Sequence, residues 1–134
     1  RRKVKKAIEL TRKNQKLVLC IAWNYGGRDE IVHAAQQLIN EKIPAKKITE
    51  ELFSQHLYTR GIPDPDLVVR TSGEYRTSNF LSWQTAYSEW YFTPTLWPDF
   101  DREELRKAIE EYGLRERRFG GRTGNDDQEG SYAG

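Results

Sequence analysis

The sequence is poor in cysteine, in long apolar runs and in net charge, and the first two shortages each exclude a class of protein. Its 134 residues include one cysteine, Cys20, so no disulfide can form within the chain. No apolar run approaches the roughly 20 residues that a membrane-spanning helix needs. The formal net charge of +2 is small and by itself says little about partners. We therefore expect a soluble, globular protein in a reducing compartment, with Cys20 as an inert core residue.

The first 16 residues are basic, with eight lysines and arginines against a single acid, Glu9. No apolar segment of the secretory type follows them, so we expect no export and a cytoplasmic location. The apolar residues among these cations indicate the end of an amphipathic helix. The cations form either a solvated face or a nucleic-acid surface. We favour the first and predict no nucleic-acid partner, because most aromatic residues lie far away, between residues 75 and 100.

Short strands and helices alternate along the rest of the chain. Residues 17–23 are an apolar run, which predicts a strand buried on both faces of a parallel sheet, and residues 66–71 predict a second strand. Helices are predicted at 28–42, from Thr49 to Gly61, at 78–88, and from Asp101 to about Arg118, where Leu105, Ala108, Ile109 and Tyr112 would face the core. An aromatic strand or extended segment lies between the last two. This alternation predicts an α/β layer fold with a mainly parallel sheet.

Ligands of such sheets gather beyond the carboxyl ends of the strands, and two segments fit that position. One is "NYGGR", residues 24–28, whose glycine turn could offer backbone N–H groups to an anion. The other is "RTSGEYRTSN", residues 70–79, where two arginines and the hydroxyls of Thr77 and Ser78 could form a diphosphate cradle. A surface turn in which an arginine pairs with Glu74 is an equally good interpretation of the second segment.

Glu89 is a carboxylate in apolar surroundings, just before the aromatic residues "WYF". It could be a core acid with a basic partner. It could equally hold Mg²⁺, which binds one or two carboxylates together with phosphate oxygens. The residues alone leave both interpretations open.

Three segments in this order, "NYGGRDEI", "DLVVRTSGEYRTSNFLSWQTAYSEWYFTPTLWPDF" and "RERRFGG", resemble the carboxyl-terminal half of the cis-prenyltransferases, the undecaprenyl diphosphate synthase family. The resemblance covers about residues 17–121. It implies a Rossmann-like three-layer α/β fold with a mainly parallel sheet, of which this chain supplies the carboxyl-terminal half. Residues 1–121 would then be part of one domain, and residues 122–134 a flexible tail.

The resemblance also implies roles for single residues. Arg70, Arg76 and Ser78 would grip the diphosphate of isopentenyl diphosphate, with Thr77 beside them, and Glu89 would serve a Mg²⁺ site. Arg118 and Gly120 resemble a tail motif that completes the isopentenyl diphosphate site across a homodimer interface. The implied reaction joins isopentenyl diphosphate to an allylic diphosphate, with loss of inorganic diphosphate and formation of a cis double bond. A basic helix end beside a glycine cap is an equally good interpretation of the tail motif.

The sequence departs from the family at its beginning, because nothing in it matches the Asp-Gly-Asn-Gly-Arg motif whose aspartate helps to bind Mg²⁺ and the allylic substrate. We therefore expect a fragment that is inactive without its amino-terminal half. The alternative is a non-catalytic partner subunit of a heteromeric cis-prenyltransferase. A long prenyl product would have to reach a bilayer, and the basic first helix could touch anionic lipid there.

Overall fold

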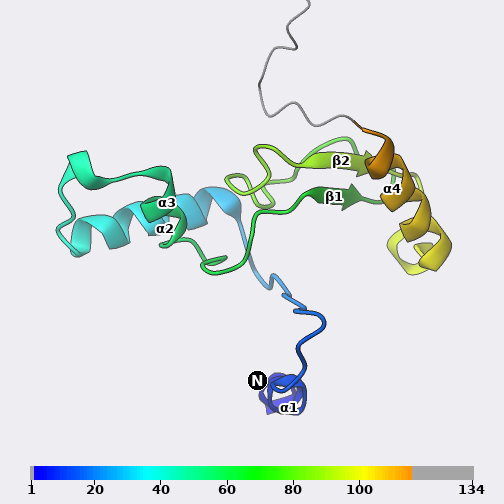
Figure 1. Cartoon of the computed structure of the whole chain (residues 1–134), viewed down its shortest axis with the longest axis horizontal. Coiled ribbons are helices and arrows are strands. Elements are labelled where there is room, and N and C mark those ends of the chain that lie inside the picture. Colours follow the sequence, from blue (N-terminus) through cyan, green and yellow to red (C-terminus); the bar gives the residue numbers. More distant parts are fainter. Residues whose placement is uncertain (1, 116–134) are drawn as a thin grey trace, which may run out of the picture.

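A computed structural model describes residues 2–115, and Figure 1 shows their arrangement. The elements in chain order are the helix α1 (Arg2–Thr11), the helix α2 (Gly27–Asn40), a short 3-10 helix (Ala45–Lys47), the helix α3 (Glu50–Ser54), the strands β1 (Leu67–Arg70) and β2 (Glu89–Phe92), a second 3-10 helix (Trp97–Asp99) and the helix α4 (Arg102–Leu114). No helix within these residues is both long and apolar enough to span a membrane. The predicted flexible tail lies outside the described residues.

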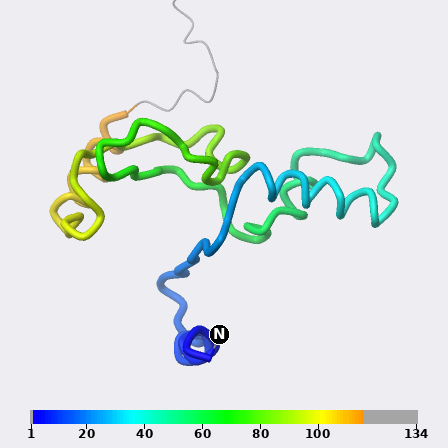
Figure 2. Tube along the Cα trace, turned by 180° about the vertical axis from the view of Figure 1, so that it is seen from behind, coloured from blue at the N-terminus to red at the C-terminus, as the bar shows by residue number. Residues whose placement is uncertain are grey.

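The strands β1 and β2 pair in parallel, and in the described part of the chain they form a two-stranded sheet. Leu67 pairs with Glu89 and Arg70 with Phe92, so the carboxyl ends of both strands meet at one edge. Helix α4 packs against β2 and lies to the right of the sheet in Figure 1. Helices α2 and α3 pack on each other to the left of the sheet, and Figure 2 shows the same arrangement from behind. Parallel pairing confirms the predicted α/β arrangement for these two strands.

The predicted helix starts are confirmed at both caps. The hydroxyl of Thr49 accepts a hydrogen bond from the backbone N–H of Leu52 at 3.2 Å, and α3 follows directly. The carboxylate of Asp101 accepts from the N–H groups of Glu103 and Glu104, at 2.9 and 3.0 Å, and begins α4. Helix α3 ends at Ser54, earlier than predicted, and turns lead from there to Gly61, which has a φ of +80°.

Much of the buried apolar core of the described residues lies on α2 and on the segment after α3. Ala34 and Leu38 of α2 are buried, and Leu57 after α3 is buried as well. On α4, Ala108 is buried. The prediction for two of its neighbours is wrong, because Leu105 and Ile109 are 45% and 54% exposed.

The prediction of a buried strand at 17–23 is wrong. Leu17, Val18 and Trp23 are 80%, 81% and 89% exposed, and Cys20 is exposed as well, so it is not a core residue here. A strand needs backbone partners on a neighbouring strand. Within residues 2–115, β1 and β2 pair with each other, and the segment that joins α1 to α2 runs away from them (Figures 1 and 2).

The prediction of a helix at 78–88 is also wrong, because this segment forms consecutive turns. Ser78, Asn79 and Leu81 have φ values of 49°, 62° and 49°, which belong to the left-handed region. A right-handed helix cannot contain these angles, and each costs an ordinary L-residue about 1 kcal/mol. The left-handed residues bend the chain back toward α2.

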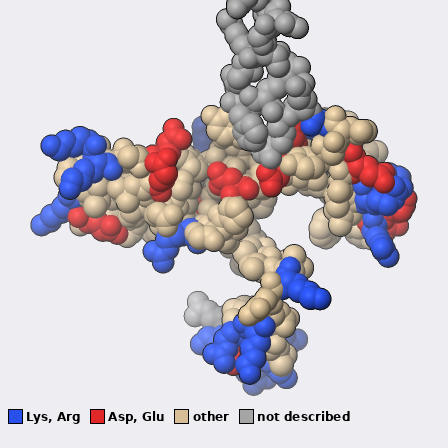
Figure 3. Space-filling view, viewed as in Figure 1, with Lys and Arg blue, Asp and Glu red and all other residues tan. Residues whose placement is uncertain are grey.

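Helix α1 forms as the amphipathic pattern predicts, with all of its described residues exposed. Figure 3 shows the lysines and arginines of α1 clustered at the bottom of the view, away from the sheet.

Candidate functional site

The candidate site is the segment of residues 70–79, here called the arginine turn, which leaves the carboxyl end of β1. Arg70 is the last residue of β1, and its Nη2 donates to the Oγ of Ser78 at 3.4 Å. Its Nε is buried and finds no acceptor among the described residues. A buried donor without an acceptor is unfavourable by about 1–3 kcal/mol. The guanidinium of Arg70 is therefore held near Ser78 with donor capacity to spare, as a site for an anion requires.

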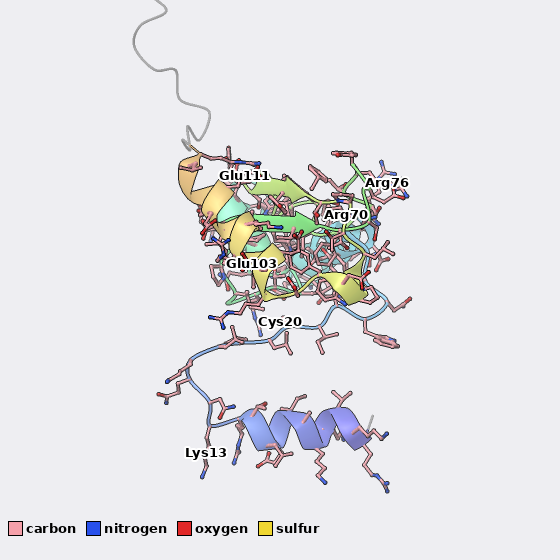
Figure 4. The ribbon with its side chains drawn as sticks, turned by 90° about the vertical axis from the view of Figure 1, so that its right-hand side faces the viewer. Lys13, Cys20, Arg70, Arg76, Glu103 and Glu111 are labelled. Carbon is pink, nitrogen blue, oxygen red and sulfur yellow. The ribbon has the colours of Figure 1, made fainter. Side chains whose placement is uncertain are left out.

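Arg76 lies at the outer side of the arginine turn, where it forms an ion pair with Glu74. The two side chains are 65% and 35% exposed. An ion pair this exposed contributes about 0–1 kcal/mol, so a doubly charged anion can compete with Glu74 for Arg76. The structure thus combines both interpretations of the segment: Arg76 has the predicted acidic neighbour, and Arg70 contacts Ser78. Figure 4 shows Arg70 and Arg76 on the same side of the sheet.

Backbone hydrogen bonds fix the base of the arginine turn. The N–H of Ser72 donates to the carbonyl of Thr95 at 2.9 Å, and the N–H of Gly73 donates to that of Thr93, also at 2.9 Å. Both residues have positive φ, 71° for Ser72 and 66° for Gly73. The arginine turn is thereby tied to the chain that leaves β2, at the shared carboxyl edge of the sheet.

The far end of the arginine turn is tied to the start of α2. The carbonyl of Asn79 accepts from the N–H of Gly27 at 2.7 Å, and its Oδ1 accepts from the N–H of Arg28 at 2.9 Å. Because these two N–H groups already have acceptors, they are not open to a ligand. The anion site predicted at "NYGGR" therefore cannot use the N–H groups of Gly27 and Arg28.

A buried acid lies next to the contact between the arginine turn and α2. Glu30, in the first turn of α2, is 0% exposed and accepts from the N–H of Tyr58 at 2.7 Å, from the Nε2 of Gln84 at 3.1 Å and from the hydroxyl of Tyr25. Gln84 also donates to the hydroxyl of Thr59 at 2.9 Å. Burial, followed by the hydrogen bond to Glu30 and the charge of Glu30, raises the pKa of Tyr25.

No pattern in the sequence indicates the contacts of Glu30 or of Asn79. The partners of Glu30 at residues 58 and 84 are 28 and 54 residues away along the chain. No local pattern signals contacts at that distance.

Glu89 does not lie beside the arginine turn. It begins β2, whereas Arg70 ends β1, which separates them by roughly 10 Å at about 3.3 Å per residue. Alternation along the strands also places them on opposite faces of the sheet. Glu89 accepts instead from Arg115, whose Nη1 is 3.0 Å from its carboxylate and 2.8 Å from the carbonyl of Trp90.

This geometry does not fit a Mg²⁺ ion that Glu89 holds on a diphosphate bound by Arg70 of the same chain. Within residues 2–115, no group of three His, Cys, Asp or Glu side chains could hold a metal ion. In the described part of the chain, Glu89 is a half-buried acid with a basic partner, which is the first of the two interpretations of the sequence.

The other predicted site residues are Thr77, Ser78, Arg118 and Gly120. Thr77 and Ser78 are exposed on the arginine turn, next to each other and near Arg76. Arg118 and Gly120 lie outside the described residues. The structure thus brings Arg70 and Ser78 into contact, keeps Arg76 and Thr77 on the same turn, and leaves Glu89 at the other end of the sheet.

A family model described as "Putative undecaprenyl diphosphate synthase" matches residues 1–120. An isoprenyl transferase of Fusobacterium nucleatum is 57% identical over 120 residues, which cover 90% of this chain and 51% of that protein. An isoprenyl transferase of Thermotoga maritima is 54% identical over 115 residues, 84% of this chain and 49% of that protein. The chain spans about half the length of these curated relatives.

The chain is also similar to solved structures of prenyl diphosphate synthases. The lavandulyl diphosphate synthase of Lavandula x intermedia, in complex with dimethylallyl diphosphate, superimposes with a TM-score of 0.81 and 39% identity, over 87% of this chain and 52% of that one. A probable undecaprenyl diphosphate synthase of Campylobacter jejuni gives 0.76 and 38%, over 89% of this chain and 55% of that one. These structures confirm the predicted fold class, of which the described residues form a part. The chain belongs to the undecaprenyl diphosphate synthase family of prenyltransferases.

Proposed function

We propose that the protein carrying this chain is a cis-prenyltransferase, and that this chain supplies its isopentenyl diphosphate site. One observation carries the proposal: Arg70 stands at the carboxyl edge of the sheet, in contact with Ser78, with a buried Nε–H that has no acceptor among the described residues. Ligands of α/β folds bind at this edge. A guanidinium matches the oxygens of a diphosphate in charge and in geometry.

In the proposed reaction, the terminal alkene carbon of isopentenyl diphosphate forms a bond to the first carbon of the allylic diphosphate. The carbon–oxygen bond of the allylic partner breaks, inorganic diphosphate leaves with the electron pair, and isopentenyl diphosphate loses a proton to give the cis double bond. The arginine turn would hold the headgroup of the nucleophile and thereby orient its alkene.

The test is the kinetics of Arg70→Ala in the complete protein. Loss of a hydrogen bond to a charged group amounts to about 1.5–3 kcal/mol, so we expect the KM for isopentenyl diphosphate to rise about 10- to 100-fold. Arg70→Lys keeps the charge but not the planar fork, and it should recover only part of the loss. Arg102→Ala, on the exposed first turn of α4, is the control. An unchanged KM in Arg70→Ala would refute the proposal and favour a non-catalytic partner subunit.

Completion of this site by Arg118 and Gly120 of a second copy stays a prediction, and mixing of variants tests it. Arg70→Ala and Arg118→Ala each damage every site of a homodimer. If the two residues belong to one site but to different copies, a mixed dimer contains one intact site, so mixing the two impaired proteins restores activity at low isopentenyl diphosphate concentration. If both residues act within one copy, mixing restores nothing.

The Mg²⁺ assignment of Glu89 also stays a prediction. Glu89→Gln in the complete protein should raise the Mg²⁺ concentration needed for half-maximal rate if Glu89 is a ligand. If the carboxylate serves only Arg115, as in the described residues, the variant should lower stability and leave the Mg²⁺ dependence unchanged. A cytoplasmic location, with transient contact of α1 with anionic lipid, remains a prediction too.

A further inference from the structure

We infer that Asn79 is a positioning residue of the isopentenyl diphosphate site, which holds Ser78 in contact with Arg70. The inference rests on the proposed function, because it assigns the means by which the arginine turn keeps its shape. Asn79 does not itself meet the diphosphate in this proposal. It acts through its neighbour Ser78.

Asn79 makes two hydrogen bonds to the start of α2, one from its main chain and one from its side chain. The carbonyl accepts from Gly27 at 2.7 Å, and Oδ1 accepts from the N–H of Arg28 at 2.9 Å. The first N–H groups of a helix have no partner inside the helix. Asn79, from 52 residues further along the chain, therefore caps α2 in place of the residue before it, Gly26, whose side chain offers no acceptor.

The junction is also sterically close. A Cβ on Gly27 would lie 2.5 Å from the Oγ of Ser82 and 2.9 Å from its backbone nitrogen. The segment that begins with Asn79 therefore lies directly on the first turn of α2. Glu30 anchors the first turn of α2, because it is fully buried and accepts hydrogen bonds from Tyr58 and Gln84.

The arginine turn needs this anchor because its last residues are strained. Ser78 and Asn79 have φ values of 49° and 62°. Asparagine tolerates the left-handed region better than serine does. Two successive left-handed residues persist only where the surrounding structure holds them. Without the hydrogen bonds of Asn79, Ser78 would relax to an ordinary φ, and its Oγ would move away from the Nη2 of Arg70, 3.4 Å away.

Asn79→Gly tests the inference in the complete protein. Glycine adopts the same φ at no cost and keeps the carbonyl for Gly27. The variant therefore removes the side-chain cap of Arg28 and the longer hydrogen bond, 3.5 Å, that the Oδ1 of Asn79 accepts from the hydroxyl of Ser82. We expect the affinity for inorganic diphosphate, measured by titration calorimetry, to fall about fivefold, or about 1 kcal/mol. Hydrogen exchange at the amide of Arg28 should become faster. Asn40→Gly, at the exposed end of α2, is the matched control.

A cycle with Ser78→Ala separates positioning from general damage. We expect Ser78→Ala to weaken diphosphate binding in the wild type and to have no further effect in Asn79→Gly, because the hydroxyl is already misplaced there. Asn79→Asp keeps an acceptor for Arg28 and tolerates the same φ. In the Asn79→Asp background, Ser78→Ala should weaken diphosphate binding by the same factor as in the wild type. If Asn79→Gly does not fold, this comparison tests the inference in its place.

The outcomes are distinct. Equal effects of Ser78→Ala in the Asn79→Gly and wild-type backgrounds would overturn the inference, as would an unchanged affinity in Asn79→Gly. In both cases the proposed function stands, provided that Arg70→Ala weakens diphosphate binding. If Arg70→Ala also binds as the wild type does, the proposed function itself fails.

Discussion

Replacement of Glu30 provides the sharpest test of how the structure supports its site. The carboxylate is 0% exposed and serves three donors: the N–H of Tyr58, an N–H of Gln84 and the hydroxyl of Tyr25. A buried carboxyl group is tolerated where hydrogen bonds compensate for lost hydration, and here three do so. Glu30 thereby joins the first turn of α2 to the segments around residues 58 and 84.

We expect two substitutions of Glu30 to lower the free energy of unfolding by different amounts. Glu30→Ala leaves three donors around a fully buried position without their acceptor, at about 1 kcal/mol or more each, so the free energy of unfolding should fall by at least about 3 kcal/mol. Glu30→Gln keeps one oxygen for Tyr58 and places an amide NH₂ near Gln84. The Oε1 of Gln84 is buried and lacks a partner among the described residues, so it can turn to accept from that NH₂. We therefore expect a loss of only about 1 kcal/mol.

Equilibrium urea denaturation of the complete protein measures both values. The control is Glu9→Gln, the same chemical change on α1, where the side chain is 69% exposed and its ion pair with Arg12 should contribute little. If both Glu30 variants unfold within about 0.5 kcal/mol of the control, Glu30 does not hold these segments together. If Glu30→Gln is as damaging as Glu30→Ala, the charge matters, and the rescue by Gln84 is wrong.

Three further perturbations follow from the same contacts. The hydrogen bond of His56 to the carbonyl of Leu52, and after it the bond to Glu41, raise the pKa of His56 above its ordinary value of 6.5. The charged imidazole thus adds stability that is full below pH 6.5 and is lost as pH rises through the folded pKa. NMR titration should show this raised pKa, and Glu41→Gln should lower it; an unchanged pKa would count against the pair. Asp101→Ala removes the cap of α4 and should lower the free energy of unfolding by about 1 kcal/mol in urea, whereas Asp101→Asn should lose much less. Arg115→Met keeps the apolar stem but leaves Glu89 unpaired, so we expect a loss of about 1 kcal/mol by the same measurement, and wild-type stability would show that the pair contributes nothing.

The sequence predicted those parts of the fold that depend on neighbouring residues. The caps at Thr49 and Asp101 are formed by side chains that bind backbone N–H groups two or three residues on, so the local sequence contains all that is needed. The strands β1 and β2 were predicted because apolar and aromatic residues lie between turn residues. The contact of Arg70 with Ser78 lies within a single turn and was accessible in the same way.

The two wrong elements depend on something beyond their own residues. An apolar run such as 17–23 is favourable as a strand only where other strands pair with it, and none does so within residues 2–115. The apolar spacing of 78–88 is compatible with a helix, but the left-handed residues at 78, 79 and 81 direct the chain toward α2 instead. In both segments the tertiary surroundings outweigh the local pattern.

The same division explains the candidate site. The residue types that could meet a diphosphate are local, since Arg70, Arg76 and Ser78 lie within nine residues of one another. Their geometry is not local, because it depends on hydrogen bonds from Asn79 to α2 and on the burial of Glu30 behind them. A motif therefore identifies the ligand that a segment could bind, whereas distant contacts decide whether the side chains converge on it. Glu89 shows the same contrast: its assignment to a metal site rests on resemblance and stays a prediction, whereas the register of β1 and β2 places it at the opposite end of the sheet from Arg70.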